Sequence, residues 1–134
     1  MKIRACVRNT PSRHLVEVAT DGATRELAIP AKSAARGSGT NGGELLMLAL
    51  ATCYCNDLFR EAARLDIALD EVEVAASADF PGVGLAAENI RYSARISSSA
   101  TKEQVEALLA TTDQVAEIHN TVRAGTPVTL EGWP

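Results

Sequence analysis

The chain has 134 residues, of which 46% are hydrophobic and 22% charged, and its net charge is −4 at pH 7. This length predicts a single domain over residues 1–134 with one core, and the composition excludes a disordered chain. The acidic balance, with Lys and Arg spread singly, argues against nucleic-acid binding. The uncharged stretch 45–56 is too short to cross a bilayer and the N-terminus lacks an apolar signal core, so we expect a cytoplasmic protein that binds no membrane.

The first third of the chain predicts three short strands, over 2–7, 14–20 and 24–29. Asp21-Gly22 separates the last two and is typical of a tight hairpin turn, so the strands should form an antiparallel meander. A loop of small residues follows over 30–43. Its Gly37–Gly42 segment fits G-x-G-x-x-G, but Pro30 ends the preceding strand early and no parallel βαβ unit surrounds the motif. We therefore expect no dinucleotide and no other cofactor.

A long helix is predicted from a cap at Asn41, closed by Glu44 three residues later, to about Leu65. Its first half, 45–56, carries no charge and should be buried on every side. Arg60, Glu61 and Arg64 should form its solvated side. The chain has three cysteines, which we expect to be free thiols in a reducing compartment: Cys6, Cys53 and Cys55. Burial without charge makes a thiol inert, so a reactive cysteine here needs a cation from elsewhere in the fold.

The remainder alternates strands and helices, which makes the fold class α+β. Period-2 patterns predict strands around Val72–Ser77 and Ile90–Ile96, joined by a Pro- and Gly-containing turn. Thr101–Gln104 is a capping box that opens a helix, and Asp113 could cap another that Gly125 ends. Val128 and Leu130 predict a last edge strand.

Four segments together resemble the OsmC/Ohr family of thiol-dependent hydroperoxide reductases. They are Gly39-Thr40-Asn41-Gly42-Gly43-Glu44-Leu45-Leu46, Ala49-Leu50-Ala51-Thr52-Cys53, Glu71-Val72-Glu73-Val74 and His119-Asn120-Thr121-Val122. The resemblance covers most of the chain. It implies an OsmC-like fold in which antiparallel sheets wrap around a long central helix in an intertwined homodimer. Such a dimer would cover the apolar half of the helix.

The resemblance also implies site residues. Cys53 matches the peroxidatic cysteine, whose thiolate attacks the peroxide and becomes a sulfenic acid. Arg13 is the best match for the activating arginine. Gly43 and Ala116 stand where the family's activating glutamate and resolving cysteine usually lie. Glu44, one position further on, is the remaining candidate carboxylate, although a step of one residue turns a helix by about 100° and the capping box gives Glu44 a structural role.

Other interpretations of these residues are structural. Cys53 and Cys55 point from opposite sides of the helix, so neither a disulfide between them nor a zinc site with His119 is expected. Cys55 suits a small buried hydrophobic position, and His119 a partly buried one with its hydrogen bonds satisfied. Tyr54 suits either pocket lining or packing. No metal site is expected.

Three functions remain open. The first is a hydroperoxide reductase that uses Cys53 and an external thiol reductant, because no resolving cysteine is present. The second is a relative without peroxidase chemistry, which binds a small apolar ligand or carries sulfur on Cys53 in a pocket at the dimer interface. The third is a dimeric interaction protein without a small-molecule site. Low reactivity of Cys53 together with a closed pocket would single out the third.

Overall fold

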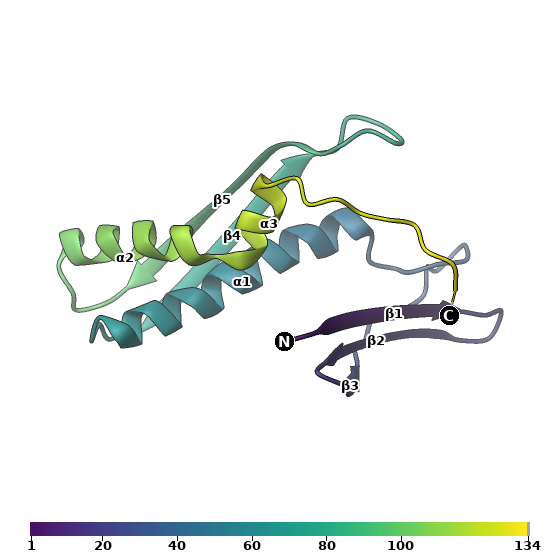
Figure 1. Cartoon of the computed structure of the whole chain (residues 1–134), viewed down its shortest axis with the longest axis horizontal. Helices are drawn as coiled ribbons and strands as arrows, with labels where there is room; N and C mark the ends of the chain where they lie inside the picture. Colours follow the sequence, from purple (N-terminus) through teal and green to yellow (C-terminus); the bar gives the residue numbers. More distant parts are fainter. Residues whose placement is uncertain (134) are drawn as a thin grey trace. The chain divides into compact units, whose positions relative to one another are not determined.

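The computed structural model describes residues 1–133, whose helices and strands are labelled in Figure 1. The contacts within the chain group into two compact units, Met1–Leu45 and Leu46–Pro134. None of the helices in the described residues is long and apolar enough to cross a membrane.

The first unit contains an antiparallel sheet in the order β1-β2-β3. Its strands are β1 (Ile3–Asn9), β2 (His14–Thr20) and β3 (Ala23–Glu26). Asp21 and Gly22 both have positive φ, 48° and 88°, which is the backbone that a two-residue hairpin turn requires. The predicted meander is confirmed, although the third strand ends at Glu26 rather than near residue 29.

The glycine-rich loop after β3 folds back on itself. Ala31 pairs with Ser38 in an isolated bridge, and the Gly39 N–H donates to the Pro30 carbonyl at 2.7 Å. A side chain at Gly39 would come within 2.9 Å of that carbonyl oxygen, so the loop needs glycine there. Every strand pair among the described residues is antiparallel, so the motif lacks the parallel unit that a dinucleotide site needs.

Helix α1 (Gly42–Arg64) begins with the predicted capping box. The Asn41 N–H donates to Glu44 Oε2 at 2.7 Å, and the Glu44 N–H donates to Asn41 Oδ1 at 2.9 Å. The expectation that the first half is buried on every side is wrong for the single chain, because Leu48 is 59% exposed. Burial follows one stripe at helical spacing, which a single packing partner produces. It contains Leu50, Tyr54, Asp57, Leu58, Glu61 and Ala62.

The core of the second unit forms between α1, α2 (Lys102–Val115) and the antiparallel hairpin of β4 (Glu71–Asp79) and β5 (Glu88–Ser97). Figure 1 shows both helices lying along this hairpin. The hairpin alternates half-buried and exposed residues, and its inward side chains pack on the buried cluster. That cluster contains Tyr54, Leu58, Ala62, Leu108 and Ala116.

Two predictions for the C-terminal part are wrong. Asp113 does not cap a helix, because it lies within α2, and Ala116 is the N-cap of α3 (Glu117–Arg123) without a side-chain cap bond. The residues after Gly125 form no strand up to residue 133. Val128 and Leu130 are 98% and 99% exposed, and neither pairs with another strand within residues 1–133. The capping box at Thr101 and the stop at Gly125, with φ of 59°, are confirmed.

Candidate functional site

Cys53 lies in the middle of α1, half-buried, with two carboxylates beside its sulfur. The Sγ atom lies 3.4 Å from Oδ2 of Asp57, one helical turn later, and 3.9 Å from Oε2 of Glu117 at the start of α3. The backbone N–H of Ile118 also donates a hydrogen bond to the sulfur. The junction between α2 and α3 therefore brings polar groups to a thiol on a largely apolar helix.

Arg60 connects the same two carboxylates. Its Nη1 lies 2.7 Å from Asp57 Oδ1 and 3.7 Å from Glu117 Oε1. The donor atoms of Cys53, Asp57 and Glu117 lie within 4.8 Å of one another, which is close enough to consider a metal ion. The arrangement does not call for one, because the guanidinium already supplies positive charge to both carboxylates.

The surroundings of Cys53 within the second unit keep its thiol protonated. Burial raises the pKa of Cys53 above its ordinary value, and the carboxylates of Asp57 and Glu117 raise it further. The hydrogen bond from the Ile118 N–H acts in the opposite direction, because it stabilises the thiolate. The thiol is thus the resting form unless a further cation approaches the sulfur.

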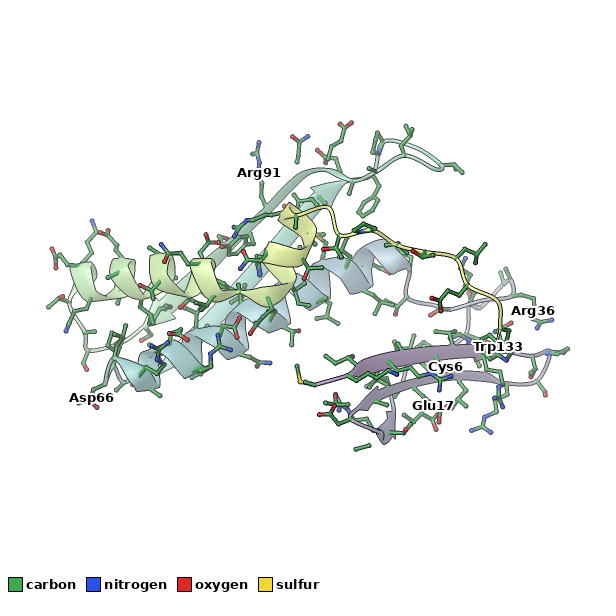
Figure 2. The ribbon with its side chains drawn as sticks, in the orientation of Figure 1. Cys6, Glu17, Arg36, Asp66, Arg91 and Trp133 are labelled. Carbon is green, nitrogen blue, oxygen red and sulfur yellow. The ribbon has the colours of Figure 1, made fainter. Side chains whose placement is uncertain are left out.

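The position of Ala116 bears on the resolving cysteine. Ala116 is fully buried, and the next two residues, Glu117 and Ile118, contact Cys53. Ala116 itself belongs to the buried core cluster, and its match to the family's resolving-cysteine position stays a prediction. All three cysteines are free, as predicted; Cys55 is half-buried, and Cys6 lies on β1 opposite Glu17 of β2 (Figure 2).

Arg13 belongs to the first unit and Cys53 to the second, so their pairing stays a prediction. Arg13 ends the loop between β1 and β2, where its N–H donates to Thr10 Oγ1 at 3.0 Å. It lines a cavity of about 200 Å³ together with Asn9, His14, Lys32 and Arg36, among others. Two of the lining residues are joined by a hydrogen bond, in which the Arg36 side chain donates to Asn9 Oδ1 at 2.7 Å.

The Glu44 carboxylate accepts a hydrogen bond from the Asn41 backbone in the capping box, one residue after Gly43. Its structural role is thus evident, and its catalytic role stays a prediction.

Tyr54, Tyr92 and His119 form an aromatic cluster in the second unit. The Tyr92 ring meets the Tyr54 ring at a centroid distance of 4.8 Å and the His119 ring at 4.4 Å, both edge to face. Tyr54 is buried in the core cluster, where its hydroxyl donates to the Leu109 carbonyl at 2.7 Å. Burial and the Asp113 carboxylate raise the pKa of Tyr92 to about 12.

His119 is more deeply buried than predicted. It is 3% exposed, and neither ring nitrogen has a hydrogen-bond partner in the described part of the chain. The prediction of a satisfied histidine is therefore wrong. Burial lowers the pKa of His119, so the ring is neutral.

Asp57, Arg60 and Glu117 were not among the site residues predicted from the sequence. The expectation that Glu61 is solvated is also wrong, since it is 2% exposed and pairs with Arg60 and Arg64. Cys53 and Asp57 are four residues apart on one predicted helix, and this spacing could have indicated that their side chains are neighbours. No local pattern could place Glu117, which is 64 residues from Cys53 in the sequence.

These features define a class: small α+β proteins with a cysteine on a long helix, surrounded by charged side chains. A family model described as OsmC-like protein matches residues 35–131. The chain belongs to the OsmC-like family. No curated protein sequence matches it.

Solved structures share the fold at low sequence identity. An OsmC-like protein from Mycoplasma pneumoniae has a TM-score of 0.68 at 16% identity, covering 92% of this chain and 88% of its own. An organic hydroperoxide resistance protein from Elizabethkingia anophelis has a TM-score of 0.57 at 21% identity. The match covers 90% of this chain and 88% of the Elizabethkingia chain. A putative organic hydroperoxide resistance protein from Vibrio cholerae has a TM-score of 0.53 at 20% identity, and its structure holds captopril in one of the active sites. The match covers 90% of this chain and 84% of the Vibrio chain.

Proposed function

We propose that the protein is a thiol-dependent reductase of organic hydroperoxides and that Cys53 is its nucleophile. The observation that carries this proposal is the half-buried Cys53 sulfur in a polar setting on α1, where the Ile118 backbone N–H favours its thiolate. An inert core cysteine would be surrounded by apolar groups instead. The names of the relatives from Elizabethkingia and Vibrio, both hydroperoxide resistance proteins, support the same chemistry.

The reaction begins with attack of the Cys53 sulfur on the terminal peroxide oxygen. An S–O bond forms as the O–O bond breaks, so the products are a cysteine sulfenic acid and an alcohol. Because Ala116 offers no second thiol, an external thiol condenses with the sulfenic acid and releases water. A second external thiol then reduces this mixed disulfide and restores Cys53.

The proposal includes further groups that the fold has to bring together. Residues 1–134 act as one domain and as a homodimer, in which Arg13 supplies the cation that favours thiolate formation at Cys53. Glu44 stays a candidate for orienting that arginine. A pocket at the dimer interface would hold the organic part of the hydroperoxide.

Mass spectrometry after one equivalent of an organic hydroperoxide tests the proposal. We expect a sulfenic acid at Cys53, or a mixed disulfide when a low-molecular-weight thiol is present. The Cys55→Ser variant is the control, because Cys55 lies two residues away on the same helix and has no role in the scheme. A protein whose Cys53 is unmodified while Cys6 or Cys55 is oxidised would refute the assignment.

A second candidate is a family member that binds a small apolar ligand or carries sulfur on Cys53 without reducing peroxides. The raised pKa of Cys53 favours it, because a thiol that stays protonated is a poor peroxide nucleophile. In that case Cys53 would remain a thiol after hydroperoxide treatment, and a fluorescent apolar probe would still bind to the dimer.

A further inference from the structure

Asp57 is a buried carboxylate whose two oxygens have different partners. It is 4% exposed. Its Oδ1 accepts from Arg60 at 2.7 Å, and its Oδ2 accepts from the Cys53 thiol at 3.4 Å. Both partners lie on α1, one turn before and one turn after Asp57, so helix geometry alone keeps the three groups together. A buried carboxylate is costly unless it is paired, and here one of its partners is the proposed nucleophile.

Glu117 also has one oxygen near Arg60 and the other near Cys53, but both contacts are longer and its side chain is more exposed. Its Oε1 lies 3.7 Å from Arg60 and its Oε2 lies 3.9 Å from Cys53, while its side chain is 69% exposed. Solvent and salt screen an exposed carboxylate more than a buried one. Asp57 is therefore the group whose position relative to the sulfur is fixed.

We infer that Asp57 accepts the Cys53 proton during peroxide attack, with Arg60 as the residue that positions it. The inference rests on the proposed hydroperoxide reduction and identifies its proton carrier. As the sulfur bonds to the terminal peroxide oxygen, the thiol proton moves to Asp57 Oδ2. The O–O bond breaks, and the departing alkoxide takes that proton as it becomes an alcohol. Sulfur is oxidised by two electrons, the peroxide is reduced by two, and Asp57 returns to its starting form.

A base in contact with the sulfur suits a thiol that is not ionised at rest. Burial and the neighbouring carboxylates raise the pKa of Cys53, so the proton has to leave during the reaction rather than before it. Among the described residues of the second unit, the carboxylates of Asp57 and Glu117 lie beside the Cys53 sulfur, and Arg60 pairs with both. Among them, Asp57 combines a short contact with burial.

The Asp57→Asn variant separates this role from a purely electrostatic one. Asparagine keeps the volume and the contact with Arg60 but is not a base. We expect hydroperoxide consumption per Cys53 at pH 7 to fall about a hundredfold, the lower end of the range for loss of a general base. Loss of the negative charge should at the same time lower the pKa of Cys53 and so speed its alkylation by iodoacetamide at pH 7. Mass spectrometry measures the alkylation rate. A structural defect would not produce these opposite changes.

Two arginine variants complete the test and do not depend on a substitution in the core. Arg60 is 45% exposed, so Arg60→Gln should fold, and we expect it to lower peroxide consumption severalfold by releasing Asp57. Arg64→Gln is the matched control: Arg64 pairs with Glu61 at 2.7 Å, one turn further along, and activity should stay within twofold.

Unchanged or faster peroxide consumption in Asp57→Asn would overturn the inference and leave the proposed function standing. If Asp57→Asn does not fold, unchanged consumption in Arg60→Gln overturns it instead. Wild-type consumption no faster than that of Cys53→Ser would overturn the proposed function and, with it, this inference.

Discussion

The polar neighbours of Cys53 act on its sulfur in opposite directions. The carboxylates of Asp57 and Glu117 stabilise the thiol, and the Ile118 N–H stabilises the thiolate. The balance in the second unit favours the thiol. The proposed reactivity at neutral pH therefore needs either proton transfer during attack or a cation beside the sulfur, for which Arg13 is the proposed residue.

His119 gives a prediction for stability. Its buried ring nitrogens have no partners among the described residues, and burial lowers its pKa. The unfolded chain, with an ordinary histidine pKa of about 6.5, binds a proton first as the pH falls, so the folded state loses stability below that pH. His119→Phe should remove this contribution and raise the unfolding free energy at pH 7 by about 1 kcal/mol.

Urea unfolding of both proteins at pH 7 and pH 5 measures the effect. Groups that titrate alike in both proteins between pH 7 and pH 5 cancel in the difference. An equal loss of stability in wild type and variant, or a variant that is less stable at pH 7, would contradict a neutral, unpartnered His119.

The sequence singled out one candidate cysteine, whose reactivity stays a prediction, but it did not predict the side chains around that cysteine. The segment ending in Cys53 resembles the family strongly enough to single out one thiol of three. Asp57 lay within the same helix and was overlooked, because a charged residue on an amphipathic helix suggests a solvated face. Glu117 and Ile118 depend on how α3 meets α1, and such tertiary contacts have no local signal.

Leu108 tests the packing of α2 on α1. It is fully buried in the cluster with Tyr54, Leu58 and Ala116. We expect Leu108→Ala to lower the unfolding free energy by about 2–5 kcal/mol, because it removes transfer energy and leaves a cavity. Urea denaturation measures the loss. Leu85→Ala is the control, since Leu85 is 62% exposed in the turn between β4 and β5; equal effects of the two substitutions would refute the described core.

The helices and hairpins were predicted well because their signals are local. Two helices begin at capping boxes, whose first residues are Asn41 and Thr101. The chain reverses direction between two strands at the Asp21-Gly22 turn. The predicted strand at Val128–Leu130 alternates apolar and other residues, but within residues 1–133 no strand pairs with it, and a strand needs a partner. The start of α3 was missed because Ala116 supplies no side-chain cap.

The exposed apolar side chains of α1 support the proposed homodimer. Leu48 and Phe59 are 59% and 49% exposed, which is unusual for large side chains on a central helix. We expect sedimentation at micromolar concentration to give a dimer and Leu48→Glu to weaken it, while Leu85→Glu leaves it intact. A stable, folded wild-type monomer under these conditions would exclude the dimer.

Hydroperoxide consumption by the wild type and by Cys53→Ser, with a dithiol as reductant, tests the proposed function most directly. The Cys55→Ser variant serves as the thiol control in the same assay. We expect the wild type and Cys55→Ser to consume an organic hydroperoxide at similar rates, and Cys53→Ser to fall to the rate of the dithiol alone. Equal consumption by wild type and Cys53→Ser would contradict the reductase and favour the ligand-binding alternative.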